Sequence, residues 1–417
     1  MLSAIGSPTL TLTEEDARRQ VALAAEATPL DGKRVLVIIP DGTRTAPIPM
    51  LFRVLNETFG ARAAAVDYLI ALGTHPPMSE EAIARLVGMT ARERERLYPR
   101  TRIFNHAWDD PARLATIGVI AGEETRELTG GMLAEPIPVA LNSLILDYDQ
   151  LVICGPVFPH EVAGFSGGAK YLFPGIAGPQ IIDSTHWLGA LRTSMDTIGV
   201  KETPVRRVIH RAATFVPRPV LCVALVMHET TLHGLYIGNH LEAFAAAADL
   251  SAQLNITWLD HPVQRVLSCP AERYDDLWTA AKAMYKTEPV VADGGEVIIY
   301  APHITEVSYT HGRLIDQVGY HVRDYFLKQW DRFRDTPGMI LAHSTHVKGK
   351  GTYDAATGVE SPRIQVTLAT GIPEERCRRI NLGYRDYRTL DPRTWADGDD
   401  ESLYAPHAGE TLYRLRA

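Results

Sequence analysis

The chain has 417 residues, of which 22% are charged, and its formal net charge is −8. This length predicts about two or three domains, each able to bury its own core. The acidic balance and the lack of any long basic run argue against nucleic acid or a membrane surface as a partner. No apolar run approaches the ~18 residues of a membrane span and the N-terminus has no secretory pattern, so we expect a cytoplasmic protein.

The N-terminal part alternates helical segments with short apolar runs that are typical of buried parallel strands. Helices are predicted over residues 13–27, from 47 onward, and over 79–86, 90–97, 204–215 and 241–254. Strands are predicted over residues 34–40, 66–72, 101–104, 150–155, 219–228 and 265–270. This alternation predicts an α/β fold with a largely parallel, Rossmann-like sheet in the N-terminal domain.

The C-terminal part repeats the alternation on a smaller scale. Helices are predicted over residues 274–285 and 314–330, and strands over 296–302, 338–344, 363–370 and 410–416. We therefore predict a cofactor-binding catalytic domain over residues 1–268 and a smaller α/β domain over residues 269–417, with the active site in the cleft between them. In this prediction the last strand can pair with either domain.

Polar motifs follow the predicted strands of the N-terminal domain. DGTR (41–44), GTHPP (73–77) and NH (105–106) each come directly after a strand. The carboxyl ends of parallel strands form the ligand-binding edge of an open α/β sheet, so these motifs are expected to meet there. Arg44 is suited to hold a carboxylate or a phosphate in a fixed plane. The alternative is a solvent-facing turn with a surface ion pair.

The densest group of reactive side chains lies within GPVFPHEVAGFSGGAKYLFPGIAGPQIIDSTHW (155–187). It contains His160, a glycine-rich turn, Lys170 and His186. The turn departs from a nucleoside triphosphate loop, because Ala169 replaces the second glycine and Tyr171 replaces the Mg²⁺-binding hydroxyl. Successive backbone amides in such a turn can still hold a phosphate without Mg²⁺.

Several histidines and one lysine leave alternatives open. His106, His160 and His186 could bind zinc and leave one position for water, as in a zinc-dependent hydrolase. Lys282, taken alone, is typical of a surface lysine. Four histidines of the second domain could line a cleft that faces the first: His303, His311, His343 and His346.

Six motifs together resemble one family. They are DGTR, GTHPP, NH, HEVAGFSGGAK (160–170), STHW (184–187) and the helix with Lys282. The chain resembles the nickel-dependent lactate racemase family, whose members racemise or epimerise 2-hydroxy acids. The resemblance covers nearly the whole chain, and HEVAGFSGGAK with its downstream histidine is its most specific part.

The resemblance implies a nickel-pincer nucleotide, which is pyridinium-3-thioamide-5-thiocarboxylic acid mononucleotide with nickel. It would be covalently attached at Lys170, with His186 as the metal ligand. The ribose and phosphate would be held by Asp41, Thr43 and the turn made of Ser166, Gly167 and Gly168. Separate maturation enzymes must build this cofactor.

The resemblance also implies the catalytic roles. His106 and His160 would be the two acid/base residues, because each stereoisomer presents its hydroxyl group from a different side. Arg44 would grip the substrate carboxylate and Lys282 would assist it. Hydride would pass reversibly to the cofactor, through a planar 2-keto acid.

This sequence departs from the lactate-specific members at the substrate pocket. Trp278 and Thr279 stand where those members have Tyr and Gln, and Val162 stands where a phenylalanine can occur. We therefore expect larger or more varied apolar 2-hydroxy acids, or sugar acids, as the small-molecule substrate. Besides the zinc hydrolase, a non-catalytic carrier of the nickel nucleotide stays open, because it would need Lys170 and His186 but not both catalytic histidines.

Overall fold

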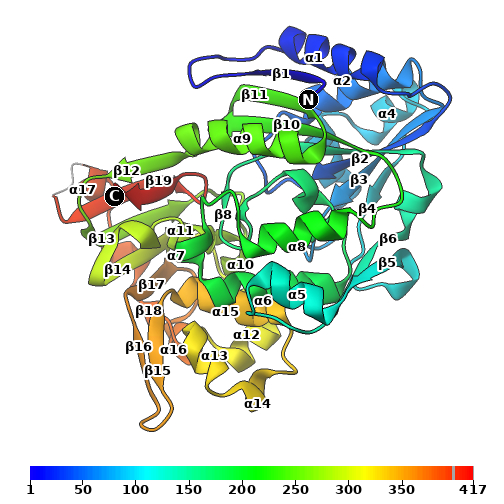
Figure 1. Cartoon of the computed structure of the whole chain (residues 1–417). Helices are drawn as coiled ribbons and strands as arrows, with labels where there is room; N and C mark the ends of the chain where they lie inside the picture. Colours follow the sequence, from blue (N-terminus) through cyan, green and yellow to red (C-terminus); the bar gives the residue numbers. More distant parts are fainter. Residues whose placement is uncertain (397–399, 417) are drawn as a thin grey trace. The chain divides into compact units, whose positions relative to one another are not determined.

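The computed structural model describes residues 1–396 and 400–416 and divides into two compact units (Figure 1). The first unit comprises residues 1–158, 165–185 and 206–254, and the second comprises residues 159–164, 186–205 and those from 255 onward. The predicted division after residue 268 differs from this partition. Residues 159–164 and 186–205 belong to the second unit although they lie within the predicted first domain. The chain enters the second unit for the last time after Leu254.

The first unit is built on a seven-stranded sheet with the order β1-β11-β10-β7-β2-β3-β4. Its strands are β1 (Ser3–Gly6), β2 (Arg34–Pro40), β3 (Ala65–Ala71), β4 (Ile103–Asn105), β7 (Gln150–Pro156), β10 (Val220–His228) and β11 (Thr231–Gly238). The strands from β10 to β4 run parallel, whereas β1 and β11 add an antiparallel edge. The predicted α/β class with a parallel-rich sheet is confirmed.

The order of the parallel strands reverses between β2 and β7. From β2 the chain adds β3 and β4 on one side, and later β7 and β10 on the other. In open α/β sheets, ligands bind beside the carboxyl ends of the strands at such a reversal. The segment 41–44 follows β2 and the glycine-rich turn follows β7, so the topology brings these two motifs to one edge.

Helices and a hairpin complete the first unit. They are α1 (Glu14–Ala27), α2 (Ile48–Gly60), α3 (Glu80–Val87), α4 (Ala91–Leu97), α5 (Gly122–Thr129), and the strands β5 (Leu114–Ile120) and β6 (Ile137–Asn142). Three helices cross the unit boundaries: α6 (Pro179–Arg192), α8 (Pro204–Ala213) and α9 (His240–Asn255). Helix α1 starts at the predicted cap, where Thr13 and Asp16 form a capping box. Helices α1 and α2 lie side by side (Figure 1), and Val21, Phe52 and Val37 belong to one buried core.

The second unit has a wholly parallel five-stranded sheet with the order β18-β17-β14-β13-β19. Its strands are β13 (Val263–Pro270), β14 (Val291–Ala301), β17 (Gln365–Thr370), β18 (Gly383–Tyr384) and β19 (Ser402–Ala408). The last strand, β20 (Leu412–Leu415), pairs with β12 (Ile256–Leu259) in this same unit. A separate hairpin is formed by β15 (Gly351–Asp354) and β16 (Val359–Pro362).

Two secondary-structure predictions for the second unit were wrong. The segment 338–344 is not a strand but part of α15 (Gly338–Lys348), in which residues 339–347 are all buried. Uniform burial removes the 3.6-residue period, so the apolar run looks like a buried strand. The predicted helix 314–330 is instead broken into α12 (Gly312–Val318), α13 (Arg323–Leu327) and α14 (Trp330–Phe333), because the chain turns at Gly319 with φ 78°.

The predicted helix 274–285 consists of two short segments, α10 (Leu277–Ala280) and α11 (Lys282–Tyr285). Two further short helices of the second unit are α7 (Ser194–Thr197) and α16 (Glu374–Arg379). Among the described residues, no helix is both long and apolar enough to cross a membrane.

Candidate functional site

The end of β2 carries a hydrogen-bonded cluster around Asp41. One carboxylate oxygen of Asp41 accepts hydrogen bonds from the backbone N–H of Thr43 (3.1 Å) and from its hydroxyl group (2.6 Å). The other oxygen lies 2.5 Å from Nδ1 of His75, which follows β3. Arg44 donates to the Thr43 hydroxyl at 2.9 Å, and its guanidinium lies over the Phe158 ring. The ends of two adjacent strands thus join a carboxylate, an imidazole and a guanidinium.

Asp41 remains ionised in this cluster. Its burial alone would raise the pKa, but His75, Arg44 and the Thr43 hydroxyl together lower the pKa well below the usual value. A carboxylate oxygen only accepts hydrogen bonds, so Nδ1 of His75 must donate to it. The tautomer of the neutral ring is therefore fixed, with its lone pair on Nε2. The His75 side chain is 22% exposed, and no other hydrogen bond to its ring involves a described residue.

His106, which follows β4, has a different environment. It is 1% exposed, its Nε2 lies 3.0 Å from the carbonyl oxygen of Ala177, and its Nδ1 lies 3.1 Å from the amide nitrogen of Asn142. The ring therefore donates from Nε2 and accepts at Nδ1. Burial lowers its pKa to about 4, so the imidazole is neutral near pH 7. Both nitrogens of this predicted acid/base residue already have partners inside the first unit.

The glycine-rich turn after β7 is held tightly in place. Gly167 and Gly168 have φ values of 80° and 58°, and a Cβ atom on Gly167 would lie 2.4 Å from the Val157 side chain. The buried guanidinium of Arg206 donates to the carbonyl oxygen of Gly167 at 3.1 Å. The Ser166 hydroxyl donates to the carbonyl oxygen of Pro156 and accepts from the N–H of Phe158. These contacts require glycine and position the turn; a bond from Ser166 to a ribose or phosphate stays a prediction.

Lys170 lies in the short 3-10 helix that the turn leads into. This helix covers Gly168–Tyr171, and the side chain of Lys170 is half-buried. The backbone N–H of Lys170 bonds to the carbonyl oxygen of Gly167 at 3.2 Å. The backbone position of the predicted attachment residue is thus fixed by the turn.

In the second unit, His160 is 5% exposed. Its Nδ1 accepts from the backbone N–H of Val162 at 3.1 Å and lies 3.3 Å from the Glu161 carboxylate. Val162 is 4% exposed, and a Cβ atom on Gly189 of α6 would lie 3.0 Å from its side chain. Val162 therefore packs closely against α6.

His186 lies on α6, in the part of this helix that belongs to the second unit. A further imidazole, His346 on α15, is 3% exposed, and neither of its ring nitrogens has a hydrogen-bond partner among the described residues. Burial lowers the pKa of His346 to about 4, Glu161 opposes that shift, and His186 adds to it. No group of three histidine, cysteine, aspartate or glutamate side chains in the described chain forms a metal site.

Lys282 is 6% exposed and is not a surface lysine. Its amino group donates to the carbonyl oxygen of Thr279 at 3.0 Å and lies 5.4 Å from the centre of the Tyr274 ring. The Asp276 carboxylate caps α10 and accepts hydrogen bonds from the backbone N–H of Thr279 (2.9 Å) and from its hydroxyl group (2.8 Å). The ring of Trp278 stacks on that of His343 at 4.0 Å.

The main residue that the sequence analysis missed is His75. It lies within GTHPP, and neither the sequence pattern nor the family resemblance assigned it a role. The available signal was its place at the end of β3, beside the strand that delivers Asp41. Of the four histidines expected to line a cleft, His343 and His346 lie on α15, and His343 donates to the carbonyl oxygen of Trp278 at 3.1 Å.

Comparisons with known proteins relate the chain to one family. Residues 23–199 match the lactate racemase N-terminal domain. The lactate racemases of Thermoanaerobacterium thermosaccharolyticum and Lactiplantibacillus plantarum are 26% and 24% identical to it, over 64% and 65% of this chain. The chain is thus related to the lactate racemases. The matched part spans 60% of the length of each of these two relatives.

Two solved structures resemble the chain over nearly its whole length. A crystal structure of a protein from Thermotoga maritima is 33% identical, with a TM-score of 0.89, and the match covers 99% of this chain and 100% of that one. The lactate racemase apoprotein of Thermoanaerobacterium thermosaccharolyticum has a TM-score of 0.72 at 18% identity, with coverages of 99% and 94%. The second match shows a shared fold.

Proposed function

We propose that this chain racemises or epimerises 2-hydroxy acids with a nickel-pincer nucleotide attached at Lys170. The observation that supports this best, beside the family, is the cluster at the strand-order reversal of the first unit. There a guanidinium (Arg44), an imidazole (His75) and an ionised carboxylate (Asp41) are hydrogen-bonded or adjacent. The glycine turn that leads to Lys170 follows the neighbouring strand β7.

The residues present fit such a cofactor. The positive φ values of Gly167 and Gly168 give the kind of turn whose successive backbone amides can hold a phosphate. Asp41 and Thr43 supply an acceptor and a hydroxyl group for a ribose, and the imidazole of His186 is a ligand type that nickel accepts. When bound, the nucleotide would take the α-hydrogen of the substrate as hydride and return it to either face. Removal as hydride avoids a second negative charge beside the carboxylate.

His75 is our first acid/base residue. Its Nδ1 donates to Asp41, so Nε2 carries the lone pair that can take the proton of the substrate hydroxyl group. The ionised Asp41 then stabilises the imidazolium that forms, and the ring returns the proton in the reverse direction. This proposal puts His75 in the role that the resemblance gave to His106, because both nitrogens of His106 are bonded inside a buried pocket.

His160 is our second acid/base residue. Its Nδ1 accepts from the Val162 backbone, so the neutral ring carries its proton on Nε2, and we assign proton exchange with the substrate to that nitrogen. Arg44 and Lys282 would hold the substrate carboxylate, since a charge-assisted hydrogen bond contributes about 1.5–3 kcal/mol. The expected cleft between the domains remains a prediction.

The substrate side chain would contact Trp278, Thr279 and Val162. Because the Thr279 hydroxyl is bonded to Asp276, it is less suited than a free amide to hold a small polar substrate. This favours larger or varied apolar 2-hydroxy acids as the proposed substrates, with sugar acids as the alternative. A zinc hydrolase is less well supported, because His106 has no nitrogen left for a metal in this structure.

The first experiment measures the intact mass of the protein after co-expression with cofactor-maturation enzymes. We expect a mass increment on the peptide with Lys170, nickel by elemental analysis, and racemisation of 2-hydroxy acids. Lys170→Arg keeps the charge but cannot form the thioamide, so it should lack the increment and all turnover. An increment that persists in Lys170→Arg would contradict the attachment site. Normal loading and nickel with no turnover on any 2-hydroxy acid would favour the carrier.

A further inference from the structure

The hairpin of β15 and β16 presents two cations and two hydroxyl groups on one face. Thr352 lies directly opposite Ser361, and the backbone N–H of Arg363 bonds to the carbonyl oxygen of Lys350 at 2.7 Å, which makes Lys350 and Arg363 the next opposite pair. Alternate residues of a strand share a face, so Lys350, Thr352, Ser361 and Arg363 point to the same side. The intervening Tyr353 is 9% exposed and packs against Tyr325 on the other side.

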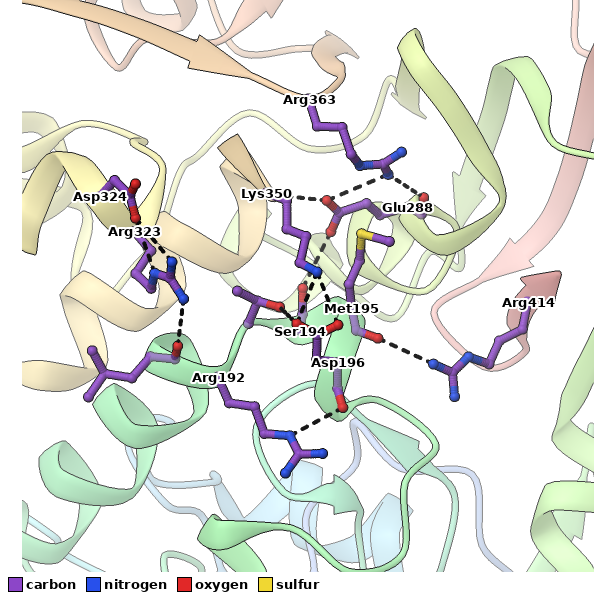
Figure 2. Close-up of polar contacts among 12 residues, drawn as sticks. Arg192, Ser194, Met195, Asp196, Glu288, Arg323, Asp324, Lys350, Arg363 and Arg414 are labelled. Atoms are coloured by element: carbon purple, nitrogen blue, oxygen red, sulfur yellow. Dashed lines mark hydrogen bonds and ion pairs between the residues drawn. The ribbon is translucent and has the colours of Figure 1, made fainter. Parts of the chain in front are cut away.

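A cavity of about 570 Å³ lies over this face. It is completed by glycines that flank Lys350, by Arg323 of α13, and by Thr193 and Asp196 beside α7. Three cationic side chains and one carboxylate line it, which gives the lining a net charge of +2 (three minus one). Figure 2 shows Lys350, Arg323 and Arg363 on separate elements, each with its own protein contacts.

Each cation at this cavity has a carboxylate partner, but these ion pairs are long or partly exposed. Arg363 donates to the backbone carbonyl oxygens of Val291 (2.6 Å) and Glu288 (2.8 Å), while the nearest oxygen of the Glu288 carboxylate lies 3.8 Å away. The carboxylate at 3.2 Å from Arg363 is that of Asp293, which is 88% exposed. Lys350 pairs with Asp196 at 3.0 Å, and these side chains are 35% and 51% exposed. Exposed pairs of this kind contribute about 0–1 kcal/mol, so an anion can replace them.

Arg323 and the hydroxyl groups of Thr352 and Ser361 are the other potential hydrogen-bond donors at this cavity. Arg323 contacts a single oxygen of Asp324, at 3.1 Å and 3.3 Å, and donates to the carbonyl oxygen of Leu191. The hydroxyl groups of Thr352 and Ser361 are exposed and have no hydrogen bond to any described residue.

We propose that this face of the second unit binds a doubly charged oxyanion, either free phosphate or the phosphate group of a small molecule. Lys350 and Arg363 would supply charge from the two strands, Thr352 and Ser361 would donate hydrogen bonds to its oxygens, and Arg323 would close the opposite side. The site is independent of the proposed racemase activity, since it uses none of the residues assigned to that reaction.

The test is calorimetric titration of the full-length protein with inorganic phosphate, in a phosphate-free buffer whose ionic strength is kept constant with chloride. We expect saturable binding that Lys350→Met weakens about tenfold or more, as the loss of one charge-assisted hydrogen bond implies. Thr352→Val removes an exposed hydroxyl group without changing charge or packing, and should weaken binding about threefold or more. Arg388→Met is the matched control, because Arg388 pairs with Asp386 on the surface and is 73% exposed.

Lys350→Met and Thr352→Val should not change the affinity of any phosphate that binds at the glycine turn of the first unit. A loss of affinity in these variants therefore reports binding at the hairpin. Tighter binding of glycerol phosphate than of inorganic phosphate would identify a small-molecule phosphate group as the ligand, and equal or weaker binding would identify free phosphate. The proposal is overturned if neither variant weakens binding more than Arg388→Met, or if chloride competes as well as phosphate.

Discussion

Two histidines at the same edge of one sheet have opposite environments. His75 follows β3, has a 22% exposed side chain and donates to an ionised carboxylate. His106 follows the neighbouring strand β4, is 1% exposed and has two uncharged partners, a backbone carbonyl and an amide. A proton taken up by His75 is stabilised by Asp41, whereas a proton taken up by His106 would place an unpaired charge in a buried pocket.

The difference teaches that position at a strand end is not enough to assign a catalytic role. The edge of the sheet selects which residues can meet a ligand, but the partners of each ring decide whether it can exchange a proton. By this criterion His75 is suited to acid/base chemistry and His106 to structural support. Three measurements test the contrast.

The largest expected effect is on turnover. His75→Asn should reduce kcat of the cofactor-loaded enzyme by about 10²–10⁴-fold, the contribution typical of a general acid/base, with little change in Tm. His106→Asn is the matched variant on the neighbouring strand and should retain turnover per loaded molecule. Chiral analysis of product at early times, together with thermal unfolding, measures both. If His106→Asn folded and loaded normally but lost turnover while His75→Asn kept it, the original assignment of His106 would stand.

The second effect is on how the free energy of unfolding depends on pH. The pKa of His106 is lowered by burial from 6.5 to about 4, so the unfolded chain binds more protons between these values. Stability contributed by the neutral ring is present above pH 6.5 and is lost as the pH falls toward 4, by up to about 3 kcal/mol. Urea unfolding at pH 7.5 and pH 5 should show a smaller loss in His106→Gln than in the parent. Equal losses in the two proteins would mean that His106 is not buried as a neutral ring.

The smallest expected effect on kcat distinguishes the charge of Asp41 from the hydrogen bonds around it. Asp41→Asn keeps the size of the side chain but removes the charge that stabilises protonated His75, so kcat should fall about 10–100-fold, which corresponds to about 1.5–3 kcal/mol. Thr43→Val removes one bond to the same carboxylate while its charge remains, and should cost less than tenfold. Steady-state rates on loaded enzyme measure both variants. A larger effect of Thr43→Val than of Asp41→Asn would show that the charge is unimportant.

Much of the fold could be predicted because its strands are unambiguous. The run 34–40 is apolar, β-branched and bounded by turn residues, and it forms β2 over the same residues. The segment 338–344 has the same apolar character, yet it lies in α15. Pro337 before it and Gly349 with φ 81° after it are helix boundary signals, but burial on all sides hides the helical period.

The site was predictable in its parts but not in its pairing. Lys170 and the glycine turn are local in sequence, so their association needs no tertiary information. The Asp41–His75 contact depends on the register of β2 against β3, and the burial of Lys282 depends on the packing of two single-turn helices. A sequence lists reactive side chains without their partners, and hydrogen-bond partners are what distinguish His75 from His106.

The repeated passage of the chain between its two compact units has a consequence for the timing of synthesis. Residues 159–164 and 186–205 leave the ribosome on either side of Lys170, yet both belong to the unit that is mostly built from residues 255 onward. Until that last part emerges, the segments that flank Lys170 in sequence have no unit to join. A chain truncated after Leu254 would contain these segments without the rest of their unit. Neither unit can therefore be produced by cutting the chain at one position. In the proposed function, we expect the cofactor to be attached at Lys170 after these flanking segments have joined the second unit.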